Sequence, residues 1–275
     1  MVGNLVMDNN KVTVSVIMGI YNTESTLAEA IDSIINQTFI DWELILCDDA
    51  SSDRTYEIAK DYAKKYSNIK LIRNKKNMGL NYTLNHCLKY ATGKYIARMD
   101  GDDLSEPYRF EKQVRFLEEH PDIAIVSSLM TCFDENGVWG QTTAVEYPTN
   151  LVFAKRTPFC HAPSMVRKEA FDAVKGYAVD KRLLRVEDYD LWIRMYAEGY
   201  KGANILEPLY RVRDDRNAKS RRKFKYRINE VYVRYLGFKR LKQPVSKFPY
   251  IFRPLLVGLM PSGLYNLLHK KQFKK

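Results

Sequence analysis

The sequence predicts an α/β fold with a mostly parallel central sheet flanked by helices, and three observations support this. Apolar segments of strand length recur at residues 12–18, 43–47, 69–73 and 93–98. Segments with the apolar spacing of a helix separate them. The first, second and fourth strand segments each end in a polar or acidic loop. Regular alternation of strands and helices is typical of βαβ units, whose strands run parallel.

Three helices are expected between these strands. The first begins after Ser25, a residue type that can cap a helix, and repeats apolar side chains at three- and four-residue steps. The second begins at Ser52 or Asp53. The third occupies about residues 80–92 and leads into the fourth strand.

The second half of the chain has a more mixed pattern. Strands are expected at residues 122–132 and 204–212, with a loop and a short strand at 159–167. Residues 187–199 have helical spacing, and a long basic helix is expected at about 217–239.

Charge is distributed unevenly along the chain. The formal net charge is +11, yet residues 1–215 hold 27 basic and 32 acidic residues, whereas 216–275 hold 17 basic residues and one acid, Glu230. A basic tail of this kind indicates a phosphate-bearing partner, such as nucleic acid, an anionic membrane or a phosphorylated substrate.

The four cysteines form no CxxC pair, which favours reduced thiols in a cytoplasmic protein over a disulfide framework or a zinc site. The first residues lack the apolar core of a signal peptide, and no apolar stretch has the length of a membrane span.

Three aspartates close the fourth strand, in the run Met99-Asp100-Gly101-Asp102-Asp103. Like charges this close repel each other and would be driven toward protonation. A divalent cation relieves this repulsion, because carboxylate oxygens suit Mg²⁺ or Mn²⁺, and such ions keep positions for substrate phosphates. The alternative is an ordinary acidic turn, since Asp and Gly are common turn residues.

Asn22, Asp49 and Asp100 each lie just past the end of a predicted strand. Ligands of parallel sheets bind at the carboxyl ends of the strands. We therefore expect these three side chains to converge on one rim of the sheet.

Eight motifs in a fixed order carry a resemblance to a known family. They are, in chain order, VSVIMGIYN at 14–22, QTF at 37–39, WEL at 42–44, DDASSD at 48–53, NMG at 77–79, GKYI at 93–96, DGDD at 100–103 and EDYDLW at 187–192. With these motifs the chain resembles the inverting family 2 glycosyltransferases of the GT-A fold, of the bacterial polysaccharide type, over residues 12 to about 213. The resemblance implies a catalytic domain at 1–215, with a nucleotide-sugar half (12–103) and an acceptor half (104–215), followed by a basic helical extension at 216–275.

The resemblance also implies a nucleotide site. Tyr21 would lie against the nucleobase, with Asn22 beside it, and Asp49 would accept a hydrogen bond from the base. Asp100 would approach the ribose. Arg216 and the basic residues after it could close over the diphosphate, or could form a solvated helix face.

A metal site and a catalytic base follow from the same resemblance. Asp102 and Asp103 would face Mn²⁺ or Mg²⁺, which stabilises the departing nucleoside diphosphate. His161 is a ligand of this ion, a residue that hydrogen-bonds one of its ligands, or a structural histidine. Inversion needs a base that takes the proton of the acceptor hydroxyl, and the family's position for it is Asp188, with Glu187 orienting it or touching the acceptor.

The implied activity is transfer of a sugar from a nucleotide donor, UDP-sugar by family habit, to a hydroxyl of a glycan or lipid-linked acceptor in surface polysaccharide synthesis. A nicotinamide or flavin enzyme should show GxGxxG after the first strand, and Gly19-Ile20-Tyr21 does not supply it. A sugar nucleotidyltransferase should carry a Gly-rich, Arg-containing loop there, which is absent. A nucleic-acid-binding protein could use the basic tail, but that reading leaves the aspartates without a role, so we expect no nucleic acid partner.

The end of the chain carries an apolar stripe at helical spacing. Its members are Phe248, Ile251, Phe252, Leu255, Leu256, Leu259, Met260, Leu264, Leu267 and Leu268. Lysines and arginines flank it on both sides, as in helices that lie in an anionic membrane interface. We therefore expect peripheral attachment to the inner face of the cytoplasmic membrane. The alternative is that the stripe packs on the catalytic domain.

Overall fold

The computed structural model describes residues 12–214 and 224–259 of the chain. One nine-stranded sheet with the order β3-β2-β1-β4-β8-β6-β9-β5 forms its centre, and β7 pairs with β6. The strands are β1 Val14–Ile20, β2 Trp42–Asp48, β3 Ile69–Arg73, β4 Tyr95–Asp100, β5 Leu104–Ser105, β6 Ile123–Asp134, β7 Gly137–Gln141, β8 Met165–Arg167 and β9 Lys201–Arg213. The α-helices are α1 Leu27–Ile35, α2 Thr55–Lys65, α3 Leu80–Leu88, α4 Arg109–Glu119, α5 Lys168–Ala173, α6 Glu187–Ala197, α7 Phe224–Arg240 and α8 Arg253–Gly258. Short 3₁₀ helices are η1 Asn150–Ala154, η2 Lys181–Leu183 and η3 Val245–Phe252.

The predicted parallel half of the sheet is confirmed. β1 pairs in parallel with both β2 and β4, and β2 pairs in parallel with β3. The strand order reverses at β1, so the carboxyl end of β1 lies at a topological switch point, where open α/β sheets bind ligands. In the second half β6 and β9 run parallel, whereas β5, β7 and β8 are antiparallel to their neighbours.

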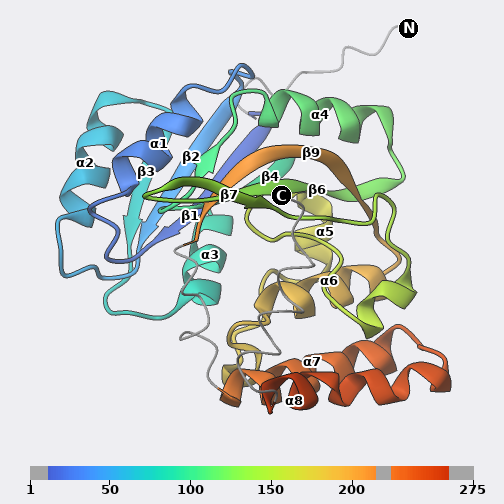
Figure 1. Ribbon diagram of the computed structural model, residues 1–275. Helices are drawn as coiled ribbons and strands as arrows, with labels where there is room; N and C mark the ends of the chain where they lie inside the picture. Colours follow the sequence, from blue (N-terminus) through green and yellow to red (C-terminus); the bar gives the residue numbers. More distant parts are fainter. Residues whose placement is uncertain (1–11, 215–223, 260–275) are drawn as a thin grey trace, which may run out of the picture.

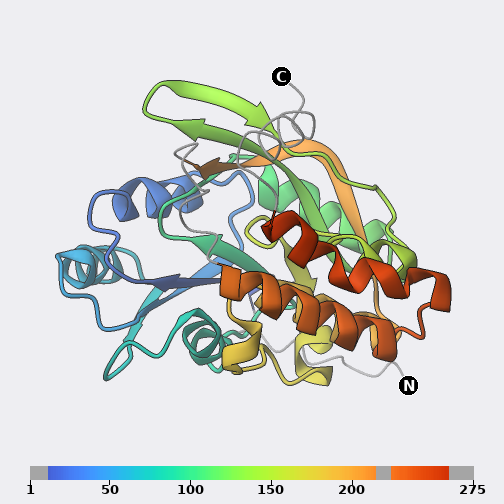
Figure 2. The same ribbon diagram turned by 60° about the horizontal axis from the view of Figure 1, so that its bottom comes forward.

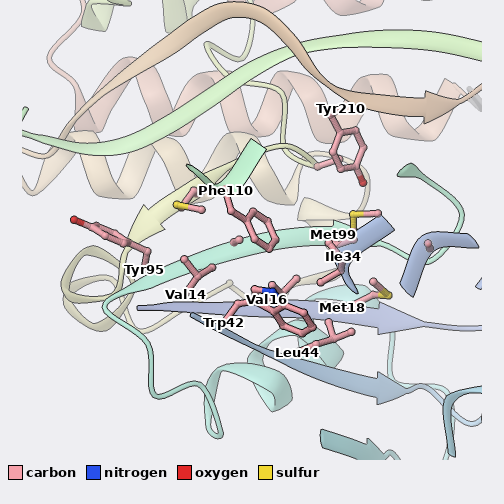
Figure 3. Close-up of a cluster of buried hydrophobic side chains, with 14 of the residues drawn as sticks. Val14, Val16, Met18, Ile34, Trp42, Leu44, Tyr95, Met99, Phe110 and Tyr210 are labelled. Atoms are coloured by element: carbon pink, nitrogen blue, oxygen red, sulfur yellow. The ribbon is translucent and has the colours of Figure 1, made fainter. Parts of the chain in front are cut away.

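Helices cover both faces of the sheet, as Figure 1 shows. Helices α1, α2 and α4 pack one hydrophobic core against the face that carries Val16 and Leu44. Figure 3 shows side chains of β1, β2 and β4 meeting Phe110 of α4 in this core, with Tyr210 of β9 at its edge. Helices α3, α5 and α6 pack a second core on the opposite face, which carries Ile17. Alternating side chains along buried strands therefore supply both cores.

The basic C-terminal segment forms a further layer outside α6. Of the helix expected at about 217–239, the structure shows α7 from Phe224 to Arg240, and positions 217–223 lie outside the described residues. Its Gly237 packs against Ile193 of α6, and an Arg240 guanidinium nitrogen lies 3.4 Å from the Asp190 carboxylate. Figure 2 shows α7 with η3 and α8 side by side at the front. Of the apolar stripe, Ile251 is buried while Phe248, Phe252 and Leu256 are exposed, so the stripe both packs on the body and faces outward. Its members from Met260 onward lie outside the described residues.

Three helix boundaries differ from the expected ones. Helix α1 begins at Leu27, and Thr26, not Ser25, takes the cap position, although the Thr26 hydroxyl donates to the Gly101 carbonyl (3.0 Å) instead of capping. Helix α2 begins at Thr55 rather than at Ser52 or Asp53, and the Asp53 carboxylate accepts the Thr55 amide (3.0 Å). Helix α3 ends at Leu88, short of the expected residue 92, and Thr92 hydrogen-bonds Glu43 of β2 through its amide and its hydroxyl.

Within the described residues, no helix combines the length and the apolarity needed to cross a bilayer.

Candidate active site

The loops after β1, β2 and β4 form a common rim. In the sheet register, Gly19 of β1 lies between Cys47 of β2 and Asp100 of β4. The loops are tied together by Asn22, whose amide donates to the Ser51 hydroxyl (3.0 Å) and whose side-chain oxygen accepts from the Ser52 amide (2.9 Å). The expected convergence of the polar loops is therefore observed.

Gly101 fits between the aspartates because the β1 loop passes close to it. A Cβ at this position would lie 3.0 Å from Ile20 Cγ2 and 3.3 Å from Thr23 Oγ1. The acidic turn can thus lie directly against the end of β1 and the start of α1.

Asp100, Asp102 and Asp103 form a cluster whose carboxylate oxygens lie within 4.8 Å of one another. Burial, then the charges of Asp100 and Asp102, raise the pKa of Asp103 to about 8. Desolvation and the Asp100 charge also raise the pKa of Asp102. Mutual repulsion of hard oxygen ligands at this spacing is relieved by a divalent cation, so these three residues fit a Mg²⁺ or Mn²⁺ site.

Residues at the end of β9 hydrogen-bond to the acidic turn at 100–103. The Arg213 amide donates to the Asp103 carboxylate (2.8 Å), and its guanidinium donates to the Asp102 carbonyl (3.1 Å) and pairs with Glu29 of α1 (2.7 Å). The Asp100 amide donates to the hydroxyl of Tyr210 (3.2 Å). Contacts from residues more than a hundred positions away in the sequence therefore hold the turn in place.

Arg98 is the cation nearest to the carboxylate cluster on its own strand. It lies two positions before Asp100, so both side chains project from the same face of β4, and the guanidinium holds the Asp100 carboxylate with two bonds of 2.8 and 2.5 Å. Arg98 is buried, and the Arg98 carbonyl accepts a hydrogen bond from the buried Arg109 (2.8 Å). Its charge also acts on Asp102 and on Asp188, lowering the pKa of both.

The Glu187–Asp188 pair occupies the first turn of α6, as expected. Burial and the neighbouring Glu187 charge raise the pKa of Asp188 to about 7, although Arg98 acts in the opposite direction. A carboxylate with a pKa near neutrality can both take up and release a proton under physiological conditions. Oε2 of Glu187 is buried and has no hydrogen-bond partner in the part of the chain described. Through Arg98, the base candidate and the carboxylate cluster belong to one electrostatic site.

His161 lies outside the carboxylate cluster. Its Nε2 is 2.9 Å from the Tyr177 hydroxyl, and its ring packs edge-on against Trp192 at 6.0 Å. Burial and the charge of Arg98 hold the pKa of His161 well below its usual range, so the ring is neutral. These contacts favour the structural role that the sequence left open, and they give no support to metal ligation.

Asp49 has a structural task beside its expected role in binding the base. The buried Asp49 carboxylate accepts from the Met78 amide (2.8 Å), the Gly79 amide (2.8 Å) and the Asn74 side chain (2.7 Å). Gly79 has φ = 85°, a conformation that favours glycine, and it stands just before α3. Asp49 therefore fixes the loop that leads into α3.

The other residues expected to bind the nucleotide differ in their exposure and contacts. Tyr21 is 47% exposed on the rim, free to meet a base. Asn22, with φ = 51°, uses its side chain to join two loops. Arg216 lies outside the described residues.

Sequence reasoning missed Arg98, Arg213, Tyr177 and Tyr210. For Arg98 a signal was available, because a charge inside a buried strand, two residues before an aspartate, must share that residue's face. The other three are brought to the site only by tertiary packing.

The family model described as Glycosyl transferase family 2 matches residues 15–175. This chain belongs to glycosyltransferase family 2. It is 51% identical over 265 residues to the putative glycosyltransferase EpsE of Bacillus subtilis (strain 168), a match that covers 96% of this chain and 95% of EpsE. It is 29% identical over 273 residues to UDP-Gal:alpha-D-GlcNAc-diphosphoundecaprenol beta-1,3-galactosyltransferase of Escherichia coli, covering 95% of this chain and 96% of that protein.

Solved structures of the GT-A fold resemble this family 2 chain. One is S. aureus TarS 1–349 in complex with UDP-GlcNAc, with a TM-score of 0.64 at 19% identity, covering 88% of this chain and 79% of that one. Another is the mannosyltransferase PcManGT of Pyrobaculum calidifontis in complex with GDP-Man and Mn²⁺, with a TM-score of 0.62 at 19% identity, covering 89% and 69%. The predicted GT-A fold is therefore confirmed.

Proposed function

We propose that this chain is an inverting, metal-dependent glycosyltransferase that transfers a sugar from a UDP-sugar to a hydroxyl of a lipid-linked glycan. The observation that carries the proposal is the Asp100–Asp102–Asp103 cluster at the carboxyl end of β4. The Glu187–Asp188 pair at the start of α6 supplies a base candidate, and the Arg98 charge that holds Asp100 also lowers the pKa of Asp188. Such a site can hold a diphosphate through a cation and remove a proton on the acceptor side.

Asp100, Asp102 and Asp103 would hold Mn²⁺ or Mg²⁺, which when bound supplies Lewis-acid stabilisation of the leaving diphosphate. Arg98 keeps the Asp100 carboxylate oriented. Arg213 keeps Asp103 in place through its backbone amide. A UDP donor is supported by the UDP-GlcNAc in the TarS complex, although the PcManGT complex holds GDP-Man.

Asp188 acts as the general base. One of its carboxylate oxygens takes the proton of the acceptor hydroxyl as the acceptor oxygen bonds to the anomeric carbon and the bond to the diphosphate breaks. Glu187 contributes through its charge, which keeps the pKa of Asp188 close to physiological pH. Attack from the side opposite the leaving group inverts the anomeric centre.

Tyr21, Asn22 and Asp49 would bind the nucleoside, with Tyr21 against the base, and Arg216 would approach the diphosphate. The name of the E. coli relative specifies an acceptor on diphosphoundecaprenol. A similar acceptor here would place the protein in surface polysaccharide synthesis, in the cytoplasm and peripheral to the inner face of the cell membrane, without a nucleic acid partner.

A donor screen tests this function. The purified full chain is incubated with UDP-, GDP- and dTDP-sugars, with and without a polyprenyl-diphosphate-sugar acceptor, and release of nucleoside diphosphate is measured. We expect fastest turnover with a UDP-sugar, loss of activity in excess chelator, recovery with Mn²⁺ or Mg²⁺, and an inverted anomeric centre by NMR. Full activity in excess chelator, retention of configuration, or tighter GDP than UDP binding would contradict the corresponding part of the proposal.

A further inference from the structure

Large apolar side chains are exposed together on α7, η3 and α8. We name them the apolar strip, and its six members are 42–73% exposed. They are Phe224, Ile228, Phe248, Phe252, Leu256 and Leu259. Single exposed apolar residues are common on soluble proteins, but a contiguous set marks an interaction surface.

Contacts within the layer show that the strip is continuous. Ile228 of α7 lines one apolar groove together with Phe248 and Phe252 of η3. Phe248 packs edge-on against both Phe252 (5.8 Å) and Phe238 of α7 (5.5 Å). A Cβ on Gly258 of α8 would lie 3.2 Å from the Phe224 ring, so the end of α8 returns to the start of α7. The strip therefore runs over α7, η3 and α8, the three elements that lie side by side at the front of Figure 2.

Cations surround the strip and most of them are unpaired. Arg227 and Arg234 pair with Glu230, the one acid of residues 224–259. Arg240 pairs with Asp190 of α6. The other cations of the layer, of which Lys247 is half-buried and the rest are exposed, have no carboxylate partner within the described ranges 12–214 and 224–259. They are Lys225, Lys239, Lys242, Lys247 and Arg253.

We propose that this face binds an anionic lipid bilayer, with the apolar strip in the interface and the unpaired cations on the lipid headgroups. This rests on the proposed function, since a lipid-linked acceptor is what makes membrane docking useful. An apolar face edged by lysines matches an anionic interface in both chemistry and charge. The sequence continues the pattern beyond the described part, with Leu264, Leu267 and Leu268 followed by four lysines.

The position of the layer favours the same partner. Helix α7 packs directly on α6, through Gly237 on Ile193 and Arg240 near Asp190. Helix α6 begins with the Glu187–Asp188 pair. One helix layer thus separates the docking face from the element that carries the base, so a bilayer-anchored acceptor would approach on the correct side of the molecule.

Vesicle flotation of the full chain tests the proposal. The probes are vesicles of phosphatidylcholine alone and of phosphatidylcholine with phosphatidylglycerol. We expect flotation with the anionic vesicles and little with the neutral ones. The double variant Phe252→Asp/Leu256→Asp should reduce the partition coefficient at least about tenfold, because it puts charge into the strip. The matched control Ile40→Asp/Leu206→Asp changes two exposed apolar residues that lie outside α7, η3 and α8, and it should float like the parent.

Two further readouts keep the result interpretable. UDP binding and thermal unfolding of each variant in solution report on the fold and on the donor site independently of membranes, so failure of the enzymatic proposal is recognised separately. Equal flotation of the strip variant and the control overturns the inference, as does equal flotation on neutral and anionic vesicles. Concentration-dependent dimerisation that the strip variant abolishes, without vesicle binding by the parent, would assign the face to a second copy of the chain and also overturn it.

Discussion

At the scale of single residues, Arg98 acts on both the carboxylate cluster and the base candidate. Its guanidinium holds Asp100 with two short bonds, while its charge lowers the pKa of Asp188 on a different element. In a buried setting a charge acts over longer distances than in water, because solvent screening is weak. Arg98 thus influences both the metal-ligand geometry and the protonation of the base.

Replacing Arg98 should shift the pH dependence of transfer. The base must be ionised, so the rate is expected to rise with pH and level off above about 7, the pKa of Asp188. Arg98→Gln removes a nearby positive charge, which raises that pKa and moves the acidic limb to higher pH. Arg98→Lys keeps the charge and is the matched control, with a limb close to that of the parent. The measurement is kcat against pH at saturating donor. If the acidic limb of Arg98→Gln has the same midpoint as that of the parent, the charge of Arg98 does not affect the pKa of Asp188.

Asp188→Asn should separate catalysis from stability. Loss of a general base reduces kcat by roughly two to four orders of magnitude, while UDP affinity stays near that of the parent. Because the folded-state pKa of Asp188 is raised, the folded protein holds a proton that the unfolded chain has lost between about pH 4 and 7, and stability falls as pH rises through this window. The neutral Asn avoids this cost, so its melting temperature at pH 7.5 should equal or exceed that of the parent. A collapse of UDP binding with normal turnover would contradict the assigned role.

Asp102→Asn should impair metal-dependent steps with little effect on the fold. It weakens a three-carboxylate cluster that fits a divalent cation, so at least about a 100-fold loss in kcat is expected. Calorimetry should show weaker Mn²⁺ binding and weaker Mn²⁺-dependent UDP binding. Asp61→Asn, an exposed change on α2, is the control, and equal Mn²⁺ affinity in the two variants would argue against the cluster as the metal site.

At the scale of elements, the sequence predicted the alternating β1–α1–β2–α2–β3–α3–β4 unit because buried strands and amphipathic helices leave clear periodic patterns. The start of α6 at Glu187 was equally readable from its spacing. Strand β5, of two residues, was not, since so short a segment has no period and exists because it pairs with β9. The contact of Arg213 with Asp103 likewise joins positions that only the folded sheet brings together.

The loop before α3 depends on one side chain, which makes Asp49 a test of element and site at once. Asp49→Ala leaves the Met78 and Gly79 amides without their acceptor, so the free energy of unfolding should fall by about 1–3 kcal/mol. UDP binding should also weaken by roughly 1.5–3 kcal/mol if the carboxylate meets the base. Asn74→Ala removes one donor to Asp49 but keeps the carboxylate, and it should destabilise the loop with a smaller effect on UDP. Equal loss of UDP binding in the two variants would assign the effect to loop order alone.

At the scale of the whole molecule, the chain is polarised. Residues 1–215 carry an excess of acids, whereas 216–275 carry 17 basic residues and one acid. Near an anionic surface this asymmetry orients the molecule with the basic α7–η3–α8 layer toward the lipid.

Salt should therefore separate membrane attachment from catalysis. The Debye length falls from about 10 Å at 0.1 M to about 3 Å at 1 M ionic strength, which screens exposed lysines far more than the buried groups around Arg98. Raising NaCl over this range should release the full chain from anionic vesicles and slow transfer to a vesicle-embedded acceptor, while hydrolysis of UDP-sugar in solution stays close to its low-salt rate. The measurements are flotation, and transfer and hydrolysis rates at each salt concentration. Salt-insensitive vesicle binding would mean that the charge asymmetry has no part in attachment. A fall in hydrolysis parallel to the fall in transfer would mean that salt slows transfer by acting on the active site and not by releasing the chain from the vesicle.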